Sequence, residues 1–198
     1  QAVDRVLHYG DGVAMVAAET REAADEAISG IRVEFEDLPG VFDPEEAMLP
    51  AAPLLHEASN VCVHHRVRKG DAAAGFAEAA IVLERTYRTQ HIEHAYIEPE
   101  AVLAEPTEDG GMRVIGSIQN IFSTRRSLAA ALGCDLARVS VEHAAMGGSF
   151  GGKDEVMTQM ACRAALLARA AGRPVKMVNS RENSMVEAYK RHPYIMHY

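Results

Sequence analysis

The sequence contains no tryptophan and only three cysteines, Cys62, Cys134 and Cys162. The cysteines stand far apart and form no Cys-x-x-Cys pair, so neither a cysteine zinc site nor an iron–sulfur cluster is expected in this chain. No stretch approaches about 18 consecutive apolar residues, which argues against a membrane-spanning helix. The N-terminal residues also lack the pattern of a secretory signal. The cysteine usage favours a reducing, cytoplasmic compartment.

An excess of basic residues is also missing. Lys and Arg total 20 against 28 Asp and Glu, which gives a net charge of −8, and the basic residues are scattered along the chain. A surface that follows nucleic-acid phosphates needs the opposite balance, so nucleic acid is not expected as a partner. Hydrophobic residues make up 48% of the chain, which is enough for a globular core.

The first part of the chain predicts a small strand–helix–strand unit followed by a linker. The apolar run 13–18 has the length of a strand, and Thr20 can cap a helix over 21–29. Apolar and charged residues alternate over 31–36, as in a half-buried strand. The proline-rich segment 38–60 predicts a linker and a domain boundary.

The remainder of the chain predicts strands and helices in a mixed order, and hence an α+β fold. We expect strands at 61–67, 80–90, 101–105, 112–118, 139–143 and 174–179. We expect helices at 71–79, 123–132 and 154–171, with Ser123 as the cap of the second. The last helix carries a stripe of alanines that permits close packing.

The two ends of the sequence predict a partial chain. Residues 1–9 contain no initiator Met and run at once into apolar residues, and residues 191–198 form an apolar, aromatic, strand-like run with no closing loop. We therefore expect the chain to be a piece of a longer protein.

The most informative stretch is the glycine-rich run Gly147-Gly-Ser-Phe-Gly-Gly-Lys153, between an expected strand and an expected helix. Its glycines indicate a backbone that bends through positive φ or lies very close to a ligand. One interpretation is a structural module in which the glycines serve packing alone. Another is a nucleotide- or phosphate-binding loop, because the run fits G-x-x-x-x-G-K, although Asp154 stands where a Ser or Thr should hold magnesium.

A third interpretation is a family resemblance. The run Met146–Lys153 resembles the Gly-Gly-Gly-Phe-Gly-Gly-Lys motif of molybdenum hydroxylases. Upstream, Gly116–Asn120 is similar to their Ser-Thr-Gln-Asn segment, and Glu93–Glu98 resembles their Glu-His-Phe-Tyr-Leu-Glu stretch. Further matches follow downstream in the same order: Pro174-Val175, Arg181-Glu182 and Arg191-His192-Pro193. Over residues 87–198 the sequence thus resembles the molybdopterin-binding subunit of the xanthine dehydrogenase/aldehyde oxidase family.

The resemblance implies a domain organisation and an activity. Residues 1–50 would be the C-terminal part of an α/β hammerhead domain, and residues 51–198 the N-terminal part of the molybdenum-cofactor-binding domain. The intact protein would be an oxidoreductase that hydroxylates an aldehyde or a purine-like N-heterocycle, with water as the oxygen source. The implied cofactor is molybdenum-molybdopterin, in its plain or its cytosine dinucleotide form. The implied partners are the rest of the molybdenum subunit and the Fe–S and FAD subunits or domains.

The resemblance also implies roles for individual residues. Gln119 matches the glutamine whose amide bonds an oxygen ligand of molybdenum, and a neutral amide can do so without adding charge to an anionic centre. Phe150 and Gly151 match the pair beside the metal, where the ring shapes the substrate pocket. The turn-shaping glycines at the cofactor are Gly147, Gly148 and Gly152. Lys153 follows the motif with a side chain that we expect to be solvated.

Two positions depart from the family pattern. Ser149 replaces a glycine, which is tolerable if its φ is negative. Asp154 stands where purine-oxidising members carry a longer glutamate that binds substrate, and it can equally be an acid that suits the helix dipole. The family's general-base glutamate would lie beyond Tyr198. The chain is therefore expected to form one wall of the site, to ligate no metal directly and to be inactive by itself.

The cluster His91-Ile-Glu93-His94 is a weaker candidate for a metal site. On a strand, His91 and Glu93 would share one side while His94 faces the other, and two ligands are too few for zinc. Structural hydrogen bonds are the expected role.

Overall fold

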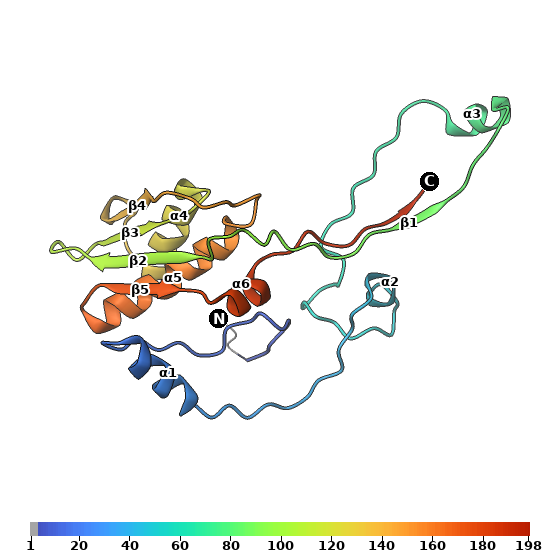
Figure 1. The fold of residues 1–198 in the computed structure, drawn as a ribbon. Helices are drawn as coiled ribbons and strands as arrows, with labels where there is room; N and C mark the ends of the chain where they lie inside the picture. The colour runs from blue at the N-terminus through green and yellow to red at the C-terminus, as the bar shows by residue number, and fades with distance from the viewer. Residues whose placement is uncertain (1–3) are drawn as a thin grey trace. The chain divides into compact units, whose positions relative to one another are not determined.

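The computed structural model describes residues 4–198, which divide into two compact units. The first unit contains residues 4–31 and 88–194, and the second contains residues 32–87 and 195–198. Gln119, the glycine-rich run and the Glu93–Glu98 stretch all lie in the first unit. The elements occur along the chain in the following order (Figure 1): α1 (Arg21–Ser29), α2 (Pro44–Ala47), α3 (Ala72–Glu78), β1 (Thr86–Arg88), β2 (Ala101–Pro106), β3 (Met112–Gly116), α4 (Ile121–Leu132), the 3-10 helix η1 (Leu136–Arg138), β4 (Val139–His143), α5 (Glu155–Ala171), β5 (Val175–Val178), α6 (Arg181–Glu187) and β6 (Ile195–His197).

The first unit is built on a four-stranded sheet with the strand order β4-β3-β2-β5. β2 pairs antiparallel with both β3 and β5, and Val102 lies opposite Gly116. β3 and β4 run parallel, and Gly116 lies opposite His143. The carboxyl ends of β3 and β4 therefore meet at one edge of the sheet, and the residues that lead into β2 reach the same edge.

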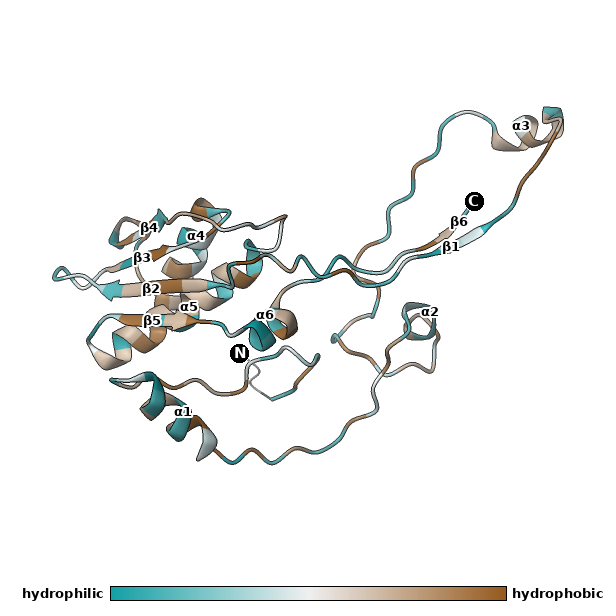
Figure 2. Cartoon of the chain, viewed as in Figure 1, coloured by the Kyte–Doolittle hydropathy of each residue, from teal (hydrophilic) through white to brown (hydrophobic). Residues whose placement is uncertain are grey.

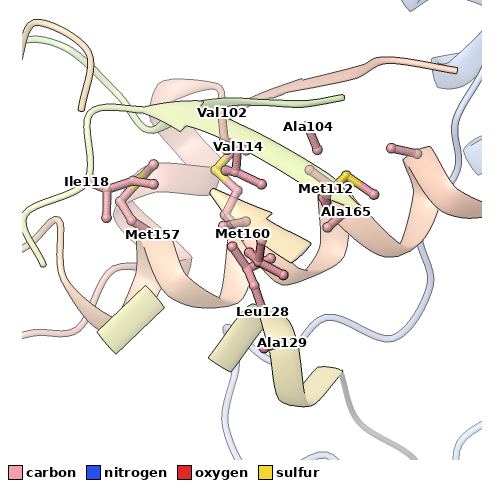
Figure 3. Close-up of a cluster of buried hydrophobic side chains, with 14 of the residues drawn as sticks. Val102, Ala104, Met112, Val114, Ile118, Leu128, Ala129, Met157, Met160 and Ala165 are labelled. Atoms are coloured by element: carbon pink, nitrogen blue, oxygen red, sulfur yellow. The ribbon is translucent and has the colours of Figure 1, made fainter. Parts of the chain in front are cut away.

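Helices α4 and α5 pack on one face of this sheet and form the core with it (Figure 3). Burial alternates along β2 and β3, as expected for strands covered on one face. Figure 2 shows hydrophobic stretches along both strands and on α4. The alanine stripe of α5 is confirmed as a packing surface, because its members are fully buried: Ala161, Ala164, Ala165 and Ala168.

The expected helices are confirmed, with one different cap. Thr20 caps α1 and accepts a hydrogen bond from the backbone N–H of Ala23. The expected cap of α4, Ser123, is wrong: the side chain of Asn120 caps the helix and accepts from the N–H of Ser123 at 3.2 Å. Asn is as good a cap as Ser, and the cap lies three residues earlier than expected, so the helix begins at Ile121. Helix α6 was not expected.

Several expected strands are wrong. Residues 13–18, 31–36 and 61–67 form no strand in the described chain, and within 80–90 only β1 does so, paired with β6. Alternating apolar residues fit a pleated surface, but a strand exists only when a second strand accepts its hydrogen bonds. In these segments many of the apolar side chains are exposed, and Val67 is 92% exposed.

The mixture of an antiparallel hairpin, a parallel pair and covering helices confirms the α+β class. The division into domains at 1–50 and 51–198 stays a prediction. Within residues 4–198, no helix has both the length and the hydrophobicity that a bilayer crossing requires.

Candidate functional site

The candidate site lies where the parallel strands β3 and β4 end. Gln119 follows β3 and precedes α4, while the glycine turn, residues 147–153, follows β4 and leads into α5. The carboxyl ends of neighbouring parallel strands are a common place for ligands in open sheets. Two backbone hydrogen bonds hold the loops together: Ala144 N–H donates to Gly116 O at 2.8 Å, and Gln119 N–H donates to Lys153 O at 2.8 Å.

The side chain of Gln119 contacts the glycine turn directly. Its Oε1 accepts a hydrogen bond from Ser149 Oγ at 2.6 Å, and Ser149 Oγ in turn accepts from the N–H of Lys153 at 3.2 Å. Among residues 4–198 no hydrogen bond engages Gln119 Nε2, and the side chain is exposed. The structure thus joins Gln119 to the turn and leaves an amide donor facing outward.

Phe150 has a backbone conformation that L residues rarely adopt. Its φ is +53°, in the left-handed region, and its side chain is 77% exposed. The flanking glycines have positive φ as well, +98° at Gly148 and +91° at Gly151. A bulky residue in this region is strained, and such strain concentrates at functional sites. Ser149 is not in the positive-φ region, so the expected condition for replacing a glycine there is met.

Gly147 and Gly152 are needed for close packing. A Cβ at Gly147 would lie 2.6 Å from both Cβ and Oε2 of Glu98, and a Cβ at Gly152 would lie 2.7 Å from Cε1 of Tyr96. Gly151 is different, because a Cβ there would meet only His94 Nε2 at 3.8 Å. The turn is therefore pressed against the Tyr96–Glu98 segment at both ends and open at Gly151.

Lys153 is not solvated, contrary to expectation. Its side chain is fully buried, and Nζ donates to Glu98 Oε1 at 2.7 Å. Nζ also lies 4.8 Å from the centre of the Tyr96 ring, where the ring's quadrupole attracts a cation. The hydrogen bond from Lys153, aided by the N–H of Gly147, holds the pKa of the Glu98 carboxyl below its ordinary value.

Asp154 lies between the turn and α5 but does not cap the helix, because its side chain accepts no capping hydrogen bond. Burial, and secondarily the charge of Glu155, raises the pKa of this carboxyl above its ordinary value. The interpretation of Asp154 as a simple helix-end acid is thus weakened. No hydrogen bond within the described chain links its side chain to Gln119 or Ser149.

The His91–His94 cluster makes structural contacts. Glu93 pairs with Lys190 at 2.5 Å between Oε2 and Nζ, and the ring of His91 lies edge-on to that of His192. No group of three metal-ligating side chains gathers anywhere in residues 4–198.

Sequence reasoning did not assign a role to Glu98. The residue lies within the Glu93–Glu98 stretch that carries the resemblance, but 55 positions separate it from Lys153, so no local spacing reveals the pair. A lysine in a tight glycine turn needs an anionic partner if it is buried, so the sequence could have suggested a carboxylate partner for Lys153 but not which one.

Comparison with known proteins identifies the family to which the chain belongs. The molybdopterin cofactor-binding domain family matches residues 55–198. The chain is 38% identical over 194 residues to the nicotinate dehydrogenase large molybdopterin subunit of Eubacterium barkeri, in a match that covers 98% of the chain and 45% of that protein. It is 40% identical over 190 residues to a probable xanthine dehydrogenase component of Bacillus subtilis, in a match that covers 96% of the chain and 25% of that protein.

Solved structures show the same fold. CO dehydrogenase from Oligotropha carboxidovorans matches 89% of this chain and 24% of its own, at 26% identity and a TM-score of 0.76. The aldehyde oxidoreductase from Desulfovibrio desulfuricans matches 97% of this chain and 21% of its own, at 24% identity and a TM-score of 0.86. The chain spans less than half the length of these relatives. It belongs to the molybdopterin cofactor-binding domain family, as found in the molybdenum subunits of the xanthine dehydrogenase type.

Proposed function

We propose that this chain forms one wall of the molybdenum-cofactor site in an oxidoreductase that hydroxylates an aldehyde or an N-heterocycle, with water as the oxygen source. The observation that carries the proposal is the junction of Gln119 with the glycine turn. An outward-facing amide lies hydrogen-bonded to Ser149, next to Phe150 with its strained backbone and exposed ring.

The residues present fit molybdenum-molybdopterin. An anionic metal centre favours neutral hydrogen-bond donors, and the Gln119 amide and the open backbone at Gly151 are of this kind. When bound, the cofactor supplies a two-electron oxidation of a carbon centre. The residues of this chain would contribute position: Gln119 Nε2 would donate to the cofactor, Gly151 would let the backbone approach it, and the ring of Phe150 would border the space for a flat substrate.

The names of similar proteins support the proposed substrate class. Nicotinate and xanthine, in the names of two relatives, are N-heterocycles, while a third relative is an aldehyde oxidoreductase. Asp154, just beyond the turn, is the residue that we propose to contact substrate. Burial, and then the charge of Glu155, raises the pKa of this carboxyl above its ordinary value, so it binds a proton more readily than a solvated aspartate does.

The other parts of the proposal rest on the resemblance. They are the hammerhead assignment of residues 1–50, the cytosine dinucleotide form of the pterin, the Fe–S and FAD partners and the cytoplasmic location. The chain alone is proposed to be inactive because the general base and other cofactor contacts come from outside it. Turnover by the isolated 198-residue chain would contradict this part.

The phosphate-loop alternative is disfavoured by the position of Lys153. In such a loop the lysine must reach phosphate oxygens, but here its ammonium group is buried and paired with Glu98. Asp154 adds a second carboxyl where that loop needs a hydroxyl. A purely structural module leaves the exposed, strained Phe150 unexplained.

The test uses the purified holoenzyme and the matched variants Gln119→Ala and Gln159→Ala. Gln159 is also an exposed glutamine with one side-chain hydrogen bond, 2.6 Å to the Tyr189 hydroxyl, but it lies on α5. We expect molybdenum and pterin in the wild-type protein, and ¹⁸O from labelled water in the product of xanthine, nicotinate or benzaldehyde. Gln119→Ala should lower kcat roughly 100-fold, as for loss of one donor to a developing charge, while Gln159→Ala should not. A wild-type protein without molybdenum and pterin would refute the proposal.

A further inference from the structure

One carboxylate joins the two ends of the glycine turn. Glu98 Oε2 accepts a hydrogen bond from the N–H of Gly147, where the turn begins, at 2.7 Å. Glu98 Oε1 accepts from Nζ of Lys153, where the turn ends, at 2.7 Å. The N–H of Glu98 also donates to Gly147 O at 3.4 Å. The turn is therefore fastened at both ends to a single residue of a different segment.

The buried end of this connection depends on the ion pair. Lys153 is fully buried, and an ammonium group inside a protein is strongly unfavourable unless it is paired. Its partners are the Glu98 carboxylate and the Tyr96 ring. Tyr96 is itself buried and donates its hydroxyl hydrogen bond to the buried Glu100. The buried side chain of Lys153 is thus held by an ion pair and an aromatic ring, and these contacts restrain the backbone atoms on either side of it.

Those backbone atoms belong to the candidate site. Lys153 O accepts from Gln119 N–H at 2.8 Å, and Lys153 N–H donates to Ser149 Oγ, which holds the Gln119 side chain. A shift of Lys153 would therefore move both the main chain and the side chain of Gln119. At the other end, a shift of Gly147 would change the path into Phe150.

We propose that Glu98 and Lys153 form a positioning pair that sets the conformation of residues 147–153, and so the placement of Gln119 and Phe150 against the cofactor. In this proposal both residues act through the turn and not by direct contact with the cofactor. This inference rests on the proposed function and adds to it two residues that act through the turn.

Glu98 and Lys153 should not be interchangeable, because the Glu98 carboxylate has two hydrogen-bond partners. It neutralises Lys153, and it accepts from the N–H of Gly147. Exchanging the charges, Glu98→Lys with Lys153→Glu, would keep an ion pair but place an ammonium donor against an N–H donor. A pair that served stability alone would be restored by the exchange, whereas a pair that shapes the turn would not.

The experiment compares holoenzymes that carry Lys153→Met, Glu98→Gln or the charge exchange. The matched control is Arg163→Met, which breaks another partly buried ion pair, 3.1 Å from Glu187, away from the turn. The readouts are molybdenum and pterin content, the Mo(V) electron paramagnetic resonance spectrum after dithionite reduction, and kcat and KM with xanthine, nicotinate or benzaldehyde.

We expect Lys153→Met to alter the Mo(V) spectrum and to lower kcat about 10- to 100-fold, with KM changed less than about threefold, because small displacements of positioned groups have effects of this size. Glu98→Gln keeps an acceptor for Gly147 and should have a smaller effect. The exchange should not restore the spectrum, and Arg163→Met should change the melting temperature alone.

The inference is overturned if Lys153→Met and Glu98→Gln lower the melting temperature but leave the spectrum and kcat at wild-type values, or if the charge exchange restores both. If Lys153→Met does not fold, Glu98→Gln carries the test by the same criteria. A wild-type holoenzyme without molybdenum and pterin would refute the proposed function itself, which is a separate outcome from unaltered variants of a loaded enzyme.

Discussion

Ser149 Oγ lies 2.6 Å from Gln119 Oε1, and this hydrogen bond connects two loops whose residues are 30 positions apart. The serine occupies a place where the resembling motif has glycine, so the contact is made by the residue that departs from the motif. By accepting with Oε1, Gln119 is oriented with its Nε2 away from the turn. The substitution in the motif therefore has a structural role, which is to fix the orientation of the amide.

Replacing Ser149 with Ala should release the Gln119 side chain. The lost hydrogen bond is solvent-exposed, so the free energy of unfolding should fall by about 1 kcal/mol, while kcat should fall roughly tenfold because the amide is no longer oriented. Urea unfolding and steady-state kinetics of the holoenzyme measure the two effects. Ser149→Thr retains the hydroxyl and should restore kcat. Equal kcat in Ser149→Ala and wild type would show that the bond does not orient Gln119.

A methyl group at Gly152 should disturb the packing of the turn. In Gly152→Ala the new Cβ would meet Tyr96 Cε1 at 2.7 Å and His94 Nδ1 at 2.9 Å, and the Tyr96 ring is buried. Overpacking of this kind costs about 1–3 kcal/mol, which thermal unfolding would detect.

The control for this change is Gly75→Ala in helix α3. No atom lies within 4 Å of a Cβ at Gly75, so alanine should raise local stability by about 0.5–1 kcal/mol through its higher helix propensity. If Gly152→Ala behaved like Gly75→Ala, the close approach of the turn to Tyr96 would be incorrect.

The sequence predicted the parts of the site but not what holds them together. Gln119 and the glycine turn could be identified because both lie in segments that resemble the motifs of the family, in the same order along the chain. The burial of Lys153 could not be predicted, since it depends on Glu98, which is 55 positions away in the sequence and lies beside Lys153 only in the folded chain. For the same reason the strand expected at 61–67 was wrong: its side chains fit a sheet, but no partner strand lies beside it in the described chain. Helices and turns depend on residues that are close in the sequence, so local patterns predict them. Paired strands and buried ion pairs join residues that are far apart in the sequence, so local patterns do not predict them.

The backbone conformation of Phe150 should lower the stability of the protein, whereas its ring should be needed for activity. Its φ of +53° is unfavourable for any residue with a Cβ, by about 1–2 kcal/mol. Phe150→Gly should therefore be more stable than Phe150→Ala by about 1 kcal/mol, although both lack the ring and should lose activity. Chemical unfolding of the two variants side by side gives this difference.

Phe122 provides the matched comparison for Phe150. Its ring is likewise exposed, at 68%, but it lies in helix α4 with ordinary helical geometry. There the order should reverse, and Phe122→Gly should be less stable than Phe122→Ala by about 0.5–1 kcal/mol. The same order at both positions would contradict a left-handed conformation at Phe150.

Asp154 should make stability depend on pH in the direction opposite to most carboxyls. Burial, and then the charge of Glu155, raises its folded-state pKa above the ordinary value of 3.8. The folded state therefore binds a proton more tightly than the unfolded state does, and stability falls as pH rises from 3.8 through the folded pKa. Asp154→Asn removes this penalty, so the variant should be more stable than wild type at pH 7, and the difference should vanish below pH 3.8.

Urea unfolding of wild type and Asp154→Asn from about pH 3 to pH 7 measures this effect. Glu155→Gln is the companion variant, because it removes the charge that is the smaller cause of the raised Asp154 pKa. In its presence, the stabilities of proteins with Asp154 and with Asn at this position should differ over a narrower pH range. A carboxyl that merely suited the helix dipole would behave in the opposite way, since its ionised form would be stabilised and Asp154→Asn would be less stable at neutral pH. The sign of one difference in stability at neutral pH thus separates a carboxyl whose pKa is raised by burial from an acid that is stabilised by the helix dipole.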